Sequence, residues 1–297
     1  MYRRGRNLIN LSFWGDNLKI KSLVEGQEVV KIYPTTTIRH ALTVMNEKKI
    51  RRIAVVDPGT NRVEGVVTSM DIVDFMGGGS KYNLVKSKHS HNLLAAINEP
   101  VKEIMTDDVI SIKETAVLGD VIRIFMEKNV GGMPVVDKDH KLISSITERD
   151  VIRKFKDKID ESEKVKDYMT EKPVVATPGE RLKDVARTML RNGFRRLPVV
   201  SEGELVGMIT STDFIKFLGS DWAFNQMKTG NVREITNIRM QDIMVKDVLT
   251  VDSNSSLVNA VEIITNNNIG ALPVVENKKL VGILTEKDIV PYFLEMK

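Results

Sequence analysis

Cysteine is absent from the chain, which excludes a disulfide framework, a thiolate zinc site and a cysteine nucleophile. No apolar run reaches the length that spans a membrane, and the basic residues 3–6 are not followed by the apolar core of a secretion signal. We therefore expect a cytoplasmic protein with no membrane partner.

A large excess of one charge is also missing. Lysine and arginine number 44 against 40 aspartates and glutamates, which gives a net charge of +4 and a pI of about 9.0 over 297 residues. This balance suits anionic ligands but falls short of the footprint of a nucleic-acid-binding protein. Nucleic acid is therefore not an expected partner. The basic arm of residues 1–26 still leaves a nucleic-acid-binding or scaffold protein open as an alternative.

Groups that could carry catalysis are scarce as well. The four histidines do not adjoin the motifs described below, and no nucleophile with its base, metal cluster or complete phosphate loop is evident. The sequence therefore predicts a protein that is not an enzyme and has neither a catalytic cofactor nor a metal.

What the chain does contain is one unit that occurs four times, so we number the copies repeats one to four. Each copy has a short apolar run, then Thr-x-x-Asp, then further apolar residues. The pattern predicts strand, helix, strand, strand and helix in that order, with the two later strands forming a hairpin, and hence an α/β (α+β) fold. The motif threonines and aspartates are Thr68 and Asp71, Thr147 and Asp150, Thr210 and Asp213, and Thr285 and Asp288. The apolar positions of the first helices are Ile38, Ala41, Leu42 and Met45; Leu118, Val121, Ile122 and Phe125; Leu182, Val185, Ala186 and Met189; and Leu257, Val258, Val261 and Ile264.

The four copies alternate in two details. Repeats one and three carry a pair of arginines before the second strand and Thr-Ser-x-Asp, whereas repeats two and four carry small residues there and Thr-Glu-x-Asp. This order indicates that a pair was duplicated. The predicted domains are an arm at 1–26, a first pair at 27–160 with repeats at about 27–76 and 100–156, and a second pair at 161–297 with repeats at about 165–218 and 240–297.

These features resemble CBS domains. The resemblance rests on the Pro-Val-Val strand, the glycine that precedes Thr-x-x-Asp, and a lead-in at 165–170 that recurs at 101–106 and more loosely at 240–245. It covers about residues 27–297. It implies four CBS repeats paired into two Bateman modules, packed as a disc with ligand sites in the clefts. A four-repeat chain without an attached enzyme is similar to the nucleotide-sensing gamma subunit of AMP-activated protein kinase and to stand-alone archaeal CBS proteins.

The sequence departs from this family pattern in two repeats. Repeat one has Ala54 in place of the strand proline and lacks the Val-x-x-x-Met lead-in. Repeat two has Ser144 where the other copies have Gly65, Gly207 and Gly282. Because all four repeats keep the motif threonine and aspartate, no site is excluded on this ground.

The Thr-x-x-Asp spacing allows two interpretations. It predicts a capping box, in which the threonine caps a helix and the aspartate bonds back to the cap N–H. The same helix end also suits phosphate or ribose oxygens, and a carboxylate there can accept bonds from ribose hydroxyls. The resemblance implies that the motif aspartates bind ribose, and the helix-end geometry makes the motif threonines candidates for contacts with ribose or phosphate.

The paired arginines are candidates for phosphate contacts. Arg51 with Arg52, and Arg195 with Arg196, enter a strand, so the two side chains of each pair point to opposite faces. Arginine forks match phosphate oxygens, although a charged strand edge that only keeps the protein soluble explains the same pattern. Further candidates are nucleotide contacts on the strands, namely Lys31, Ser111, Thr250, Met133, Pro134, Leu197, Pro198, Ala271 and Pro273.

Two connectors remain, after repeats one and three. Residues 77–81 are glycine-rich but lack the spacing of a phosphate loop, which favours a flexible joint. Lys86, Lys88, His89 and His91 follow and suit a solvated basic segment. In the second connector, Trp222 and Phe224 are expected to pack on the core.

The predicted function is a non-catalytic sensor that binds AMP, ADP or ATP reversibly and regulates an unknown protein. A homodimer is compatible with the sequence. A sensor of S-adenosylmethionine or methylthioadenosine is the alternative on the same fold. A sulfonium ligand needs no arginine cluster, so the arginine pairs favour the nucleotides.

Overall fold

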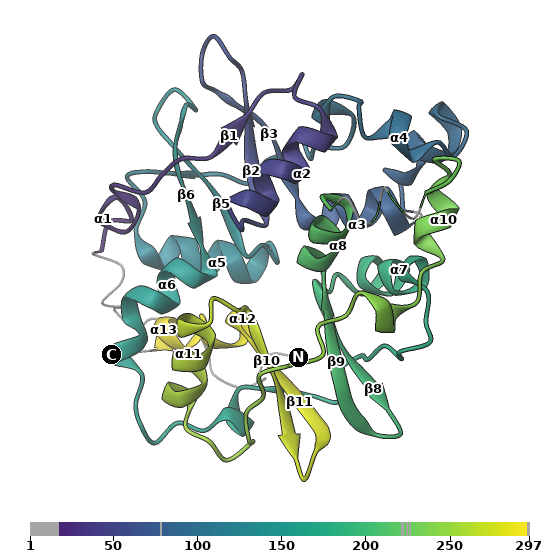
Figure 1. Ribbon diagram of the computed structural model, residues 1–297. Helices are drawn as coiled ribbons and strands as arrows, with labels where there is room; N and C mark the ends of the chain where they lie inside the picture. The colour runs from purple at the N-terminus through teal and green to yellow at the C-terminus, as the bar shows by residue number, and fades with distance from the viewer. Residues whose placement is uncertain (1–17, 78, 221–222, 224, 226, 296–297) are drawn as a thin grey trace. The chain divides into compact units, whose positions relative to one another are not determined.

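The computed structural model describes residues 18–77, 79–220, 223, 225 and 227–295, drawn as ribbon in Figure 1. Residues 1–17, which make up most of the basic arm, lie outside these ranges, as do Trp222 and Phe224. None of the helices in the described ranges combines the length and the apolar character that crossing a bilayer requires.

Repeats one and two adopt the full predicted order of elements, and repeats three and four do so except that a single bridge replaces the first strand. Repeat one comprises β1 (Lys31–Ile32), α2 (Ile38–Glu47), β2 (Arg52–Val56), β3 (Val63–Thr68) and α3 (Ser69–Gly77). Repeat two comprises β4 (Ile112–Lys113), α5 (Leu118–Glu127), β5 (Gly132–Val136), β6 (Leu142–Thr147) and α6 (Glu148–Phe155). Repeat three comprises α7 (Leu182–Asn192), β8 (Arg196–Ser201), β9 (Glu204–Thr210) and α8 (Ser211–Leu218). Repeat four comprises α11 (Leu257–Asn266), β10 (Ala271–Glu276), β11 (Lys279–Thr285) and α12 (Glu286–Ile289), followed by α13 (Tyr292–Glu295).

Short elements fill the segments between the repeats. They are α1 (Lys21–Val24) before repeat one, η2 (Leu84–Lys88) and α4 (Leu93–Ala96) in the first connector, and η3 (Val101–Glu103). Beyond repeat two lie η4 (Lys156–Lys158), η5 (Val165–Asp167), β7 (Thr170–Glu171), α10 (Val232–Thr236) and η6 (Met240–Asp242).

The first strand of each repeat is shorter than the sequence suggests. In repeats three and four it reduces to single parallel bridges, Ala176 with Val199 and Val251 with Val274. Val199 and Val274 are each preceded by a proline, Pro198 or Pro273. Because proline has no backbone N–H, the parallel ladder cannot extend toward the N-terminal end of the second strand. Repeat one has Ala54 at this position, and its ladder begins one residue earlier, at Lys31.

The apolar stripes of the first helices are buried as predicted, with one exception. In α11 the buried residues are Leu257, Ala260, Val261 and Ile264, so Ala260 replaces the predicted Val258. Spacings of three, four and seven from Leu257 place these residues on one face, whereas Val258 lies about 100° around the helix. The last helix is also short, because Pro291 follows its end and cannot continue it.

The chain forms two compact units, each assembled from separated segments. The odd-repeat unit consists of residues 30–109 and 174–248, and the even-repeat unit of residues 18–29, 110–173 and 249–295. In the first, α3 packs against α7 and α8; in the second, α6 packs against α11 and α12. Each unit has one hydrophobic core. The predicted boundary near residue 160 therefore does not separate these units, because the helices join alternate repeats. The pairing of consecutive repeats stays a prediction.

Within each unit, the N-terminal ends of the two helices that follow the motifs lie next to each other. The residue after the motif threonine determines which side chains make the contact. In the odd-repeat unit, the buried hydroxyls of Ser69 and Ser211 are hydrogen-bonded at 2.8 Å. In the even-repeat unit, the corresponding residues are buried glutamates, and Arg149 Nε donates to Glu286 Oε1 at 2.5 Å. The alternation of serine and glutamate thus reflects two ways of filling the centre of a unit.

The lead-ins border the hairpins of the neighbouring repeat in sequence. Thr106 bridges β3 of repeat one at Val66, and Val245 bridges β9 of repeat three at Met208. In the other direction, β7 of the repeat-three lead-in pairs with β11 of repeat four. Repeats three and four therefore each supply an edge segment to the hairpin of the other, and repeat two supplies one to repeat one.

A glycine and a methionine meet at each of these borders. A Cβ atom on Gly65 would lie 2.4 Å from Met105 Sδ, and one on Gly207 or Gly282 would lie 2.7 Å from the sulfur of Met244 or Met169. The corresponding position in the repeat-two hairpin has neither the glycine nor, among the described residues, a methionine against it. Ser144 stands in place of the glycine, and its hydroxyl lies 3.5 Å from Gln27 Oε1. Two departures noted in the sequence, the missing lead-in of repeat one and the missing glycine of repeat two, therefore concern the same packing contact.

Candidate functional site

The four Thr-x-x-Asp motifs are capping boxes, as the spacing predicts. In every copy the aspartate Oδ2 accepts bonds from the N–H and the hydroxyl of the motif threonine. The N–H distances are 2.6 Å at Asp71 and 2.8 Å at Asp150, Asp213 and Asp288, and the hydroxyl distances are 2.6–2.7 Å. A cap of this kind contributes about 1 kcal/mol to helix stability. The cap uses only the Oδ2 oxygen of each carboxylate.

The second oxygen, Oδ1, has a different environment in each copy. Oδ1 of Asp150 accepts no hydrogen bond from the described residues. Oδ1 of Asp288 lies 3.5 Å from the Thr170 hydroxyl, and Oδ1 of Asp213 lies 3.7 Å from the ammonium of the largely exposed Lys216. These three oxygens keep acceptor capacity that a ligand hydroxyl can use.

Burial perturbs two of these carboxyls. It raises the pKa of Asp213 and Asp288 above the ordinary value of 3.8, while the hydrogen bonds from their threonines act in the opposite direction. A carboxylate that is short of solvent gains more from a new hydrogen-bond donor than an exposed one does. Hydroxyl donors from a bound ligand would therefore be favoured here.

A hollow lies beside Asp150 in the even-repeat unit. It has a volume of about 280 Å³ and is lined by the motif aspartate, by Arg153 and Lys154 of α6, and by Ser22, Leu23 and Gln27 from the segment before repeat one. A carboxylate with two cations nearby matches a ligand that carries both hydroxyl and anionic groups.

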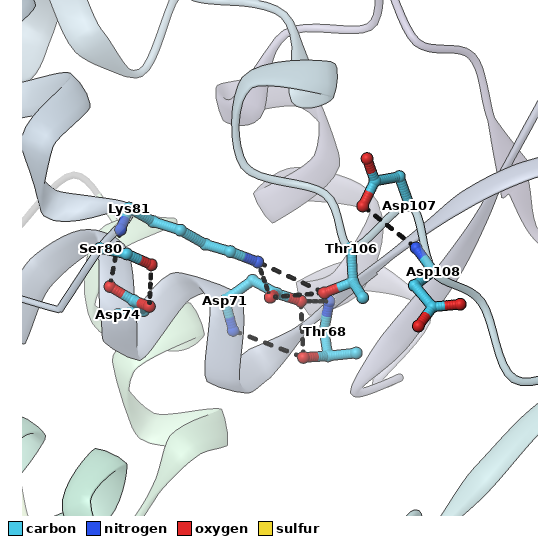
Figure 2. A network of polar contacts seen from close by, with 8 residues as sticks. All are labelled: Thr68, Asp71, Asp74, Ser80, Lys81, Thr106, Asp107 and Asp108. Carbon is cyan, nitrogen blue, oxygen red and sulfur yellow. Dashed lines mark hydrogen bonds and ion pairs between the residues drawn. The ribbon is translucent and has the colours of Figure 1, made fainter.

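Asp71 differs from the other three. Its Oδ1 is ion-paired with the ammonium of Lys81, and the Thr106 hydroxyl donates to the same oxygen at 3.3 Å, as Figure 2 shows. The lysine comes from the glycine-rich connector, which is not a loose joint at this point. Asp74 holds it, accepting from the Lys81 backbone N–H at 2.9 Å and from the Ser80 hydroxyl at 3.3 Å.

The register places one arginine of each pair beside the motif. Arg52 is directly opposite Thr68, and Arg196 is directly opposite Thr210, so each shares a sheet face with its threonine. Arg51 and Arg195 instead accept, through their backbone carbonyls, the N–H of the serine that opens the following helix. All four arginines are partly buried.

The predicted strand contacts fall into two groups. Pro134, Pro198, Ala271 and Pro273 share a sheet face with the motif threonines. Met133 and Leu197 lie on the opposite face, where their side chains are buried in the hydrophobic cores, so a ligand contact at these two positions would have to use the backbone. Among the first-strand positions, Ser111 and Thr250 are partly buried, and Lys31 donates to Asn61 Oδ1 at 2.6 Å within its own repeat.

Sequence reasoning missed several residues of these sites. Thr106 and Thr170 close the lead-ins and lie against the aspartate of the neighbouring repeat, and Lys81 reaches Asp71 from the connector. The recurrence of threonine after the lead-in methionine was a usable signal. The position of Lys81 had none, because it depends on the turn at Asp74.

Comparison with known proteins agrees with this geometry. The model of the CBS domain matches residues 23–78, 101–157, 165–220 and 240–295. The chain therefore belongs to the CBS-domain family and is a regulatory protein of that family with four copies of the domain.

Individual relatives match most of the length of the chain. Protein MJ1225 of Methanocaldococcus jannaschii is 62% identical over 277 residues, which cover 93% of this chain and 99% of the relative. Its crystal structure, described as that of a candidate archaeal homologue of g-AMPK, superposes with a TM-score of 0.90 at 61% identity over 93% of this chain and all of the other. A protein of Thermofilum pendens is 28% identical over 86% of this chain and 85% of its own length.

Proposed function

We propose that the chain is a non-catalytic sensor that binds AMP, ADP or ATP reversibly at its Thr-x-x-Asp motifs. The observation that carries the proposal is that the two oxygens of the carboxylate have different environments in three of the four motifs. One oxygen caps a helix, and the other is left to accept ribose hydroxyls at Asp150, Asp213 and Asp288. Similarity to MJ1225, a candidate homologue of g-AMPK, supports an adenine nucleotide as the ligand.

The phosphates would be bound by basic residues near the motifs. Arg52 and Arg196 share the sheet face of the motif threonine, and Arg153 and Lys154 line the hollow beside Asp150. Guanidinium groups form paired bonds with phosphate oxygens, which a sulfonium ligand cannot offer. The proposal therefore ranks nucleotides above S-adenosylmethionine. The regulated partner protein and a homodimer remain predictions from the sequence.

The test is calorimetric titration of the full chain with AMP, ADP, ATP and S-adenosylmethionine. The informative variants are Asp150→Asn and Asp288→Asn, since an amide oxygen can keep the cap while the amide nitrogen replaces the acceptor Oδ1. Each should weaken nucleotide binding at one site by about tenfold or more, as expected when a buried polar partner of a ligand hydroxyl is lost.

Asp120→Asn supplies the matched control. Asp120 also lies in the first turn of a helix, α5, but outside the motifs, and its side chain is half exposed. It should leave binding unchanged. Failure of all three nucleotides to bind the folded wild-type protein would refute the proposal, and binding of S-adenosylmethionine alone would replace it with the alternative sensor.

A further inference from the structure

Lys81 holds the position in repeat one that a ribose hydroxyl would occupy in the other repeats. Its ammonium is ion-paired with Asp71 Oδ1 and lies 3.4 Å from the Thr106 hydroxyl (Figure 2). The lysine side chain is 19% exposed and that of Asp71 only 9%, so the pair is largely removed from water. Both oxygens of Asp71 are thus engaged by the protein itself, Oδ2 by the cap and Oδ1 by Lys81.

The connector is built to present this lysine. Asp74 lies one turn beyond Asp71 on α3 and accepts the Lys81 backbone N–H and the Ser80 hydroxyl. A Cβ atom on Gly79 would lie 2.3 Å from Asp74 Oδ1, so the backbone approaches the carboxylate more closely than any other residue type allows. With the backbone fixed at one turn of the helix, the lysine side chain spans back to the preceding turn.

The other motif aspartates have no comparable occupant among the described residues. Lys216 is the nearest equivalent, but it is 62% exposed, stands 3.7 Å from Asp213 and comes from the same helix at a spacing of three residues. Such an exposed pair adds little energy and yields readily to a ligand. The ion pair of Lys81 is more buried and is held by a second carboxylate.

We propose that Lys81 acts as an internal occupant of the first site and sets its affinity. A nucleotide can bind at Asp71 only after the ammonium has left Oδ1, so the apparent affinity is reduced by the fraction of molecules in which Lys81 is displaced. The inference rests on the proposed function, since it concerns the same class of ligand. It makes repeat one the weakest of the four sites and assigns the difference to one side chain.

The test is titration of the full chain with AMP, comparing the wild type with Lys81→Met, which keeps the aliphatic stem and removes the charge. Lys81→Met should add a binding event or strengthen one about tenfold, which corresponds to a site that is open in about one molecule in ten. Adding Asp71→Asn should abolish the gain. Lys86→Met, an exposed lysine in the same connector, should behave like the wild type.

A second measurement needs no variant. Acetylation of the native protein, followed site by site by mass spectrometry, should modify Lys81 more slowly than Lys86, and AMP should accelerate it at Lys81 alone. Slower modification of Lys81 with AMP, or weaker binding by Lys81→Met, would overturn the inference by making this lysine a phosphate ligand. If the wild type binds AMP at other sites and Lys81→Met matches it, only this inference fails. If neither protein binds AMP, the proposed function fails with it.

Discussion

Replacement of Gly65 by alanine tests the contact between a hairpin and the lead-in of the next repeat. The new Cβ would lie 2.4, 3.0 and 3.2 Å from the Sδ, Cγ and Cε atoms of Met105. Because non-bonded heavy atoms settle at about 3.5–4.0 Å, the methionine has to shift by about 1 Å. Met105 is partly buried, and its Sδ and Cε atoms lie at the end of a flexible side chain that can move. We therefore expect Gly65→Ala to lower the free energy of unfolding by about 1 kcal/mol, the lower end of the range for overpacking.

Gly59→Ala is the matched control in the same hairpin. Its Cβ would meet only Asp57 Oδ1, at an ordinary 3.6 Å. The change should therefore be neutral or stabilise by up to about 1 kcal/mol, because alanine restricts the unfolded chain. Urea unfolding followed by circular dichroism measures both effects, and the slope of the transition shows whether the mechanism of unfolding is unchanged.

A double-mutant cycle then identifies the partner. Met105→Ala removes the atoms that Cβ meets, so Gly65→Ala should cost about 1 kcal/mol less in that background than in the wild type. Additive effects of the two substitutions would refute the reasoning, because they would show that the glycine is needed for some reason other than the methionine.

Two further predictions concern charge. Burial raises the pKa of Asp213 and Asp288 above 3.8. Between pH 3.8 and these raised pKa values, the native state therefore binds more protons than the unfolded state. The stability of the wild type relative to Asp213→Asn or Asp288→Asn should therefore fall as pH rises through this interval, and unfolding midpoints that show a flat or rising difference would contradict it. Arg149→Met should lower the free energy of unfolding in urea by about 3 kcal/mol, because it removes a charged partner from the buried Glu286. Arg123→Met, which removes a partner from an exposed ion pair, should lower it by less than about 0.5 kcal/mol. Equal losses of stability in the two variants would refute the distinction.

The sequence was sufficient for features that depend on local spacing. The order of elements, the buried stripes of α2, α5 and α7, and the four capping boxes follow from periods of two and 3.6 residues and from the reach of a side chain over one turn. The correction at Val258 is of the same kind, since the other three helices already showed the spacing that selects Ala260.

Features that depend on a choice among similar surfaces were out of reach. All four repeats present an apolar helix stripe, so the sequence does not say that α3 meets α7 and α8 while α6 meets α11 and α12. The face of Met133 and Leu197 depends on strand register, which a run of apolar residues leaves open. The position of the Lys81 side chain depends on a backbone turn fixed by Asp74, and no local sequence pattern specifies this turn.

The exchange of lead-ins constrains how this chain can change over evolution. Residues 101–106 belong to the odd-repeat unit, although the repeat that they introduce belongs to the even-repeat unit. A gene fragment that encodes repeat three or repeat four alone would carry an edge segment for the other repeat and lack the one for its own hairpin. Loss of one of these two repeats would therefore also remove a backbone partner from the hairpin of the repeat that remains.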